Sequence, residues 1–125
     1  MMHGTVRGMI LTGLVASLVT PLTAQEGPPG APSPAERQRN NAAKLAGLVA
    51  FVDASCPDLK GDPDKLRMAV TRLGVDPAEL NQGDLHLRAR AYTEIYQKDA
   101  EASCKRAVET FGEAGKAIPG LIVRK

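Results

Sequence analysis

The chain has 125 residues, with 16 Lys and Arg against 14 Asp and Glu, two Cys and no Trp. A chain of this length has room for one small domain. The formal net charge is only +2 and the aromatic residues are two Tyr and two Phe, which argues against a polybasic surface for nucleic acid or membranes and against a stacking platform for bases.

The first 24 residues have the three-part layout of a secretory signal peptide. His3 and Arg7 give a short basic start, residues 9–19 are apolar, and residues 20–24 end in Thr-Ala. The apolar stretch is well short of the ~20 residues that span a membrane, so we expect no stable membrane anchor after cleavage. We therefore predict that residues 1–24 are a signal peptide and that the mature protein is periplasmic or secreted.

Cleavage of the signal peptide is predicted after Ala24. The neighbourhood of Thr20 is the alternative, because Leu22, three positions before that cut, is larger than the small residue usually found at this position. A flexible linker is expected to follow the cleavage site. Residues 25–33 carry three Pro and two Gly and offer nothing apolar to bury. The helical domain is then predicted to occupy residues 34–125.

The first helix has clear start and stop signals. Residues 33–36 read Ser-Pro-Ala-Glu, which is a capping box, and an apolar stripe at spacings of three and four then runs from Leu45 to Cys56. Pro57 disfavours a helical conformation for the residue before it. We predict a helix from Pro34 to about Ser55.

Two shorter helices are predicted next. Asp62-Pro63 repeats the start signal, and Gly74 supplies the left-handed residue that commonly ends a helix. Asp76-Pro77 begins a third, short helix that should end before residues 81–83. The connections are short, which favours antiparallel packing of neighbouring helices.

A single long amphipathic helix is predicted from Asp84 to about Phe111, because apolar residues recur at steps of three or four throughout this segment. The pattern allows a bend near Asp99. Residues 121–123, Leu-Ile-Val, form an apolar tail that we expect to fold back on the helices rather than to serve as an exposed partner motif. No segment alternates with period two over enough residues to predict a sheet.

The two cysteines predict a disulfide. Cys56 and Cys104 each lie on the apolar face of a predicted helix in a chain that is expected to be exported. A redox-active pair or a zinc site is disfavoured, because the cysteines are far apart in the sequence and few other ligands are at hand. The predicted fold is therefore all-α, a small four-helix bundle with one disulfide linking the end of helix 1 to the last helix.

Four carboxylates near the Cys56-Pro57 corner are candidate ligands for a hard cation such as calcium. The candidates are Asp53, Asp58, Asp62 and Asp64. Their spacing does not match a twelve-residue calcium loop, and neighbouring lysines dilute the charge. The alternative interpretation is a solvated acidic corner.

Three aromatic residues are candidates for the lining of an apolar pocket. Tyr92 and Tyr96 are i, i+4 neighbours on the apolar face of the last helix, and Phe111 ends that face. The alternative is that they belong to the core. His86 is the one histidine left after signal cleavage; we expect it at the surface or at the boundary with the core, with a pH-sensing or ligand role as the alternative. A lone histidine with no cysteine or serine partner in view predicts that the protein is not an enzyme.

The expected function is that of an exported, small, helical, non-enzymatic binding or interaction protein whose partner is another envelope protein. The alternatives are a carrier or sensor of a hard cation or small apolar ligand, and a chaperone-like periplasmic stress protein. The chaperone alternative follows from layout: in size, export and two widely spaced helical cysteines, the chain resembles the small acid-stress chaperones of the bacterial periplasm. No cofactor is expected, and the sequence predicts no oligomeric state.

Overall fold

The computed structural model describes residues 31–125. The predicted signal peptide, residues 1–24, and most of the predicted linker, residues 25–33, lie outside the described part of the chain. The elements in chain order are α1 (Pro34–Ser55), β1 (Leu59–Gly61), α2 (Pro63–Arg72), the 3-10 helix η2 (Pro77–Asn81), α3 (Gly83–Gln97), α4 (Ala100–Phe111) and β2 (Ile122–Arg124). The fold is thus mostly helical, with a small sheet.

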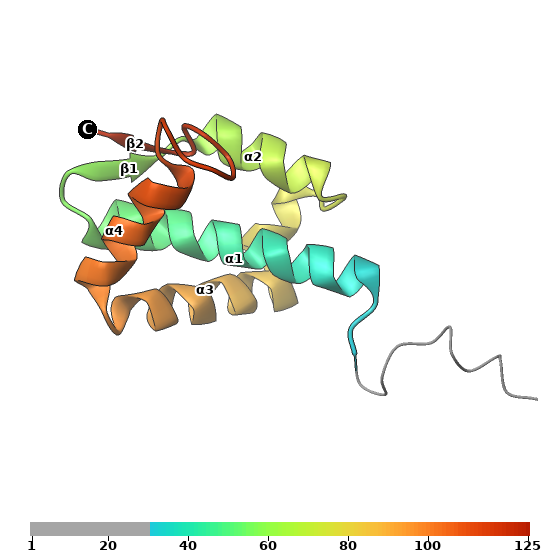
Figure 1. The fold of residues 1–125 in the computed structure, drawn as a ribbon. Coiled ribbons are helices and arrows are strands. Elements are labelled where there is room, and N and C mark those ends of the chain that lie inside the picture. Colours follow the sequence, from blue (N-terminus) through green and yellow to red (C-terminus); the bar gives the residue numbers. More distant parts are fainter. Residues whose placement is uncertain (1–30) are drawn as a thin grey trace, which may run out of the picture. The chain divides into compact units, whose positions relative to one another are not determined.

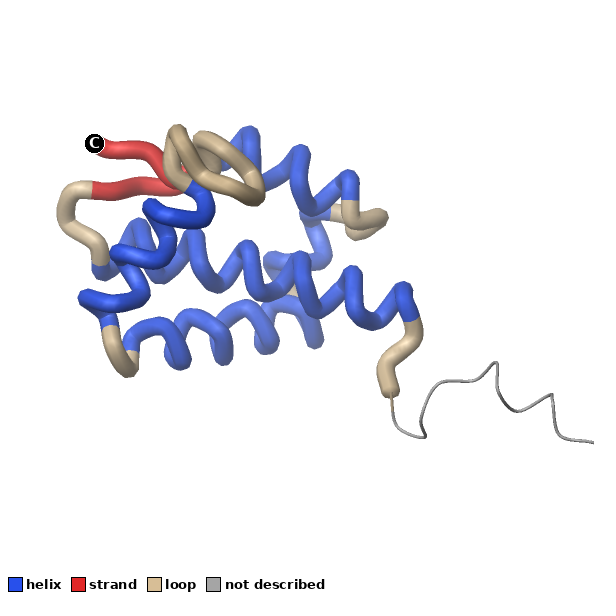
Figure 2. Tube along the Cα trace, in the orientation of Figure 1, coloured by secondary structure: helices blue, strands red, loops and turns tan. Residues whose placement is uncertain are grey.

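Helix α1 is the central element, and α2, α3 and α4 all pack against it (Figure 1). Helix α3 runs alongside α1, and α4 crosses the C-terminal end of α1 (Figure 1). The long loop between α4 and β2 lies against α2 (Figure 2), where the Lys65 ammonium donates to the carbonyl oxygen of Pro119 at 3.2 Å. The helices are therefore gathered around α1, with α2 on one side and α3 on the other.

The predicted helix starts are confirmed by their caps. The Ser33 hydroxyl accepts from the Glu36 amide at 3.1 Å, the Asp62 carboxylate accepts from the first amides of α2, and the Asp76 carboxylate accepts from the Ala78 amide at 2.9 Å. Each cap satisfies an amide that the helix itself leaves without a partner. Helix α1 ends at Ser55 as predicted.

The prediction of one continuous helix from Asp84 to Phe111 is wrong. The chain breaks at Lys98 and Asp99 into α3 and α4, and the Asp99 carboxylate caps the second helix by accepting from the Ala102 amide at 3.3 Å. Both helices bury a stripe of the same phase, so the apolar pattern alone does not reveal the break. The break turns α4 away from α3 and across the end of α1 (Figure 1).

The structure also contains a two-stranded antiparallel sheet that the sequence did not predict. Strands β1 and β2 pair in the register Leu59 with Arg124 and Gly61 with Ile122. Each strand has three residues, which is too short to show an alternating pattern. The predicted return of the C-terminal tail is confirmed, because Leu121 and Ile122 are buried.

The predicted disulfide is present. Cys56, just after α1, is bonded to Cys104 in α4, and the two residues are 48 positions apart in the sequence. Disulfides persist in oxidising environments, so the bond indicates a location outside the cytoplasm. Among the helices of residues 31–125, none is both long enough and apolar enough to span a membrane.

Two clusters of buried side chains form the interior. The first, which we call the disulfide core, is made of Leu48, Val49, Phe51, Val52, Cys56, Leu59, Ala107, Leu121 and Ile122. The second, which we call the alanine core, is made of Ala42, Ala43, Val70, Val75, Leu80, Leu85 and Ala89. The disulfide core joins α1 to α4 and the sheet, whereas the alanine core joins α1 to α2, η2 and α3.

Small side chains let α1 and α3 approach closely. A Cβ added at Gly47 would lie 2.5 Å from the carbonyl oxygen of Ala89 and 2.8 Å from the Cβ of Tyr92, so no larger residue fits there without a shift. The Thr93 hydroxyl is within hydrogen-bonding distance of the Gly47 carbonyl oxygen, at 2.9 Å. The close contact and this hydrogen bond fix the position of α3 against α1.

Candidate functional site

The candidate site is a cleft that reaches from α2 to α3 across α1, with η2 at one end. Its volume is about 570 Å³. A cleft of this size falls in the usual range for sites that bind small molecules or a few side chains of a partner. Each of these elements contributes one face of the cleft, so no single stretch of the sequence predicts the site.

The inner surface of the cleft is apolar. It includes Val49 from α1, Val70 from α2, Leu80 from η2 and Ala89 from α3, all of them buried members of one core or the other. Ala50, on the same face of α1, is exposed and lies at the opening. A ligand entering the cleft would therefore remove apolar surface from water, which is the main source of affinity for such sites.

His86 is the best-positioned polar group of the cleft. Its Nδ1 lies 3.1 Å from the carbonyl oxygen of Leu80. A carbonyl can only accept, so Nδ1 carries the hydrogen and Nε2 is left to accept from a ligand when the ring is neutral. The sequence predicts His86 at the surface or at its boundary with the core, and the structure makes it half-buried at the edge of the cleft.

Two guanidinium groups and the Asp53 carboxylate line the cleft. Arg67 belongs to α2 and Arg90 to α3, so they come from opposite walls. Arg67 is paired with Asp64, whereas Arg90 makes no ion pair within residues 31–125. Planar guanidinium groups bind carboxylates with two parallel hydrogen bonds, so the cleft favours an acidic group on its ligand.

The four predicted cation ligands have separate roles. The Asp53 carboxylate, which lines the cleft, accepts from the Gly61 amide at 2.9 Å; Asp62 caps α2; and Asp64 pairs with Arg67. Asp58 is exposed, and its carbonyl oxygen accepts from the Lys125 amide at 3.0 Å. In residues 31–125, no group of three or more His, Cys, Asp or Glu side chains is gathered as a metal ion would require. These contacts lend the cation hypothesis no support.

The three aromatic candidates lie within the packing between helices. Tyr96 and Phe111 pack against the disulfide core, and Tyr92 packs against the alanine core. The rings of Tyr92 and Tyr96 are 6.4 Å apart between centroids, and the Tyr92 hydroxyl accepts from the Asn40 amide at 2.7 Å. Burial raises the pKa of the Tyr96 phenol above its ordinary value. None of the three lines the cleft, and their contacts agree with the alternative interpretation as core residues.

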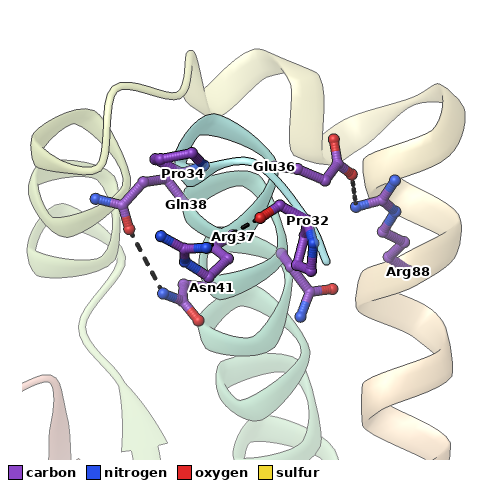
Figure 3. Close-up of a pocket in the computed structure, with 8 residues that line it drawn as sticks. Pro32, Pro34, Glu36, Arg37, Gln38, Asn41 and Arg88 are labelled. Atoms are coloured by element: carbon purple, nitrogen blue, oxygen red, sulfur yellow. Dashed lines mark hydrogen bonds and ion pairs between the residues drawn. The ribbon is translucent and has the colours of Figure 1, made fainter. Parts of the chain in front are cut away.

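A second hollow lies at the N-terminal end of α1, and Figure 3 shows its lining residues. Arg88 reaches across from α3 to Glu36 at 2.6 Å and to Asp84 at 2.8 Å. The hydrogen bond with Glu36 raises the pKa of the Arg88 guanidinium, and the charge of Asp84 adds to this effect. Most of the lining residues carry polar or charged side chains, Arg88 is already paired with Glu36, and the Arg37 guanidinium donates to the carbonyl oxygen of Pro32 at 2.9 Å, so fewer charged groups are free for a ligand here.

A third hollow, of about 460 Å³, lies between α2 and the loop before β2. Leu45, Met68 and Ile118 give it an apolar surface, and Lys65 at its rim already donates to Pro119. Arg72 is its other cation. The fold positions fewer polar groups around this hollow than around the cleft, so the hollow would discriminate less well between ligands.

Comparison of the chain with protein-family models, with curated proteins and with solved structures gives no match. The residues of the cleft are therefore the basis for a function. Of these residues, sequence reasoning singled out Asp53 and His86, each for another reason. It missed Arg67 and Arg90, because a single arginine on an amphipathic helix carries no signal that separates a ligand-binding role from a solvated one.

Proposed function

We propose that this protein is an exported, non-enzymatic binding protein that holds a segment of another envelope protein in the cleft between α2 and α3. The segment would present apolar side chains to the inner surface and a carboxylate to Arg67 and Arg90. The observation that carries the proposal is the combination of a buried apolar surface with two arginines on opposite walls. We further propose that the compartment is the periplasm or the medium outside the cell, in keeping with the Cys56–Cys104 bond.

Binding without catalysis is supported by how the reactive side chains are engaged. His86 bonds to the main-chain carbonyl of Leu80, and within residues 31–125 no hydrogen bond joins its ring to a serine or cysteine side chain as in a nucleophile–base pair. Both cysteines are consumed by the disulfide, and within residues 31–125 there is no free thiol. A binding role does not require any of these side chains to give up its present bond.

The test is affinity capture from the envelope of the source cell with three forms of the mature, oxidised protein. Ala50→Trp places a large ring at the opening of the cleft, whereas Ala54→Trp places the same ring on another exposed alanine of α1 that does not line the cleft. We expect the parent and the Ala54→Trp variant to retain one partner in near-stoichiometric amount and the Ala50→Trp variant to lose it. Melting temperatures within a few degrees of each other will show that all three are folded.

Equal capture of that partner by the Ala50→Trp variant would show that the partner does not bind in the cleft.

A second experiment tests the alternative function, a carrier of a small ligand. The same cleft suits a small apolar ligand with an acidic group, so mass spectrometry under non-denaturing conditions should be run on the protein purified from its own cell. A retained small molecule that is absent from the Ala50→Trp variant would favour a carrier over an interaction protein.

A further inference from the structure

Helix α3 carries an apolar ridge on its outer side that no other part of residues 31–125 covers. Leu87 is 64% exposed and Ile95 is 53% exposed, and the exposed Ala91 lies midway between them. The spacing of four residues places the three side chains within roughly 80° of the helix circumference. Large exposed apolar side chains that line up in this way are typical of contact surfaces.

The ridge is symmetric about Ala91, and its ends carry opposite charges. Leu87 lies four residues before Ala91 and Ile95 four residues after it. Asp84, which also pairs with Arg88 of the same helix at 2.8 Å, lies seven residues before and Lys98 seven residues after, both exposed. If a second α3 is laid antiparallel on the first with the two Ala91 residues in contact, Leu87 of each copy packs beside Ile95 of the other. Each Asp84 then lies opposite a Lys98, at both ends of the contact.

We propose that the chain forms an antiparallel homodimer through the outer face of α3, centred on Ala91. A two-fold contact of this kind uses the same surface on both copies, so a self-complementary pattern is what it requires. The small alanine at the centre lets the two helices approach closely. One pair of helices of this length buries less than the roughly 1,200 Å² of a standard interface, so the dimer is weak and depends on protein concentration.

The proposed dimer contact uses other residues than the proposed ligand site. Of the four residues that α3 contributes to the cleft, His86, Ala89 and Thr93 lie roughly 140° or more around the helix from the centre of the ridge, and Arg90 lies roughly 100° from it. Leu87, Ala91 and Ile95 do not line the cleft, so substitutions on the ridge test the dimer without changing a cleft residue.

The first test is sedimentation equilibrium of the mature, oxidised protein over a concentration range up to about 1 mM. We expect a monomer–dimer equilibrium in the parent that the Leu87→Glu variant shifts at least tenfold toward monomer. The matched control is Met68→Glu, because Met68 on α2 is 54% exposed, close to the exposure of Ile95. A monomeric parent at every concentration, or an equal shift in the control, would overturn the proposal.

The second test fixes the orientation. Asp84→Lys and Lys98→Asp each place like charges at both ends of the contact and should weaken the dimer about tenfold, and the double exchange should restore it. Ala91→Cys should form a dimer through a new disulfide on mild oxidation, whereas Ala54→Cys should not. Failure of the double exchange to restore the dimer, or failure of Ala91→Cys to cross-link, would rule out this antiparallel arrangement.

Discussion

The two cores of this protein are built in different ways around one helix. The disulfide core contains four of the six largest fully buried side chains, Phe51, Val52, Leu121 and Ile122, and a covalent bond closes it. The alanine core contains the other two, Leu85 and Val70, beside three alanines, and it also depends on the close approach at Gly47 and on helix caps such as Asp62 and Asp76. The fold therefore concentrates its stability at the end of α1 that joins α4 and the sheet.

The difference has a functional consequence. The cleft lies over the alanine core, between elements that are held to α1 by packing, caps and the ion pairs Arg39–Glu79 and Arg88–Glu36 rather than by a covalent bond. Segments with fewer large buried contacts open at lower free energy than a cross-linked core, and binding surfaces are commonly drawn from such segments. The disulfide core then acts as a rigid support on which α2, η2 and α3 adjust to a ligand.

Among the predicted effects, the loss of stability on removal of the disulfide should be the largest. Replacing Cys56 and Cys104 with Ser opens a loop of 48 residues and leaves two hydroxyls in an apolar setting, so we expect a loss of ~3 to 5 kcal/mol in the free energy of unfolding. Urea unfolding followed by circular dichroism measures the loss. The disulfide would be shown not to support the fold if the double variant melts at the parent temperature and both cysteines of the unreduced parent react with an alkylating agent.

A matched pair of truncations should separate the two cores. Leu85 in the alanine core and Ile122 in the disulfide core are each 1% exposed, and truncation of either to Ala should cost about 2 to 5 kcal/mol. In hydrogen exchange, we expect Leu85→Ala to increase opening mainly in α2, η2 and α3. The Ile122→Ala variant should increase it mainly in the sheet and α4. The same exchange pattern in both variants would show that the two cores unfold as one.

Gly47→Ala tests the close contact between α1 and α3. Alanine favours a helix by about 1 kcal/mol over glycine, yet here its Cβ would meet the carbonyl of Ala89. We expect the steric effect to prevail and the free energy of unfolding to fall by about 1 to 3 kcal/mol. A gain in stability, measured by thermal or urea unfolding, would mean that α3 can move away from α1 at little cost.

The smallest expected effect is a change in stability at alkaline pH. Burial raises the pKa of the Tyr96 phenol, so its full contribution is present below the ordinary value of about 10, where both states are protonated. As pH rises through the raised folded-state pKa, the unfolded state loses this proton more readily and the free energy of unfolding falls. Tyr96→Phe should flatten this decline above about pH 10. An unchanged slope would assign the decline to other groups.

The local signals of the sequence predicted much of the fold. Ser33, Asp62 and Asp76 each stand one residue before a proline, and each caps a helix where predicted. These caps depend on neighbours within three residues, so they can be seen in the sequence. The disulfide was predictable for a similar reason, since two cysteines admit one intramolecular pairing.

The features that were missed depend on contacts between distant segments. Strand β1 exists because residues 122–124 return to pair with it, and neither strand is long enough to show a pattern alone. The break at Asp99 leaves the apolar stripe in phase, although a capping residue was present as a signal. The cleft is lined by Arg67 and Arg90 from two helices whose arrangement in space the sequence does not specify.

Native-state hydrogen exchange of the mature, oxidised protein tests the central claim most directly. We expect amides in the C-terminal half of α1, in α4 and in the sheet to exchange only through global unfolding. Amides of α2, η2 and the first half of α3, which surround the cleft, should exchange through openings of distinctly lower free energy. Uniform protection across both cores, or higher protection around the cleft than around the disulfide, would contradict it.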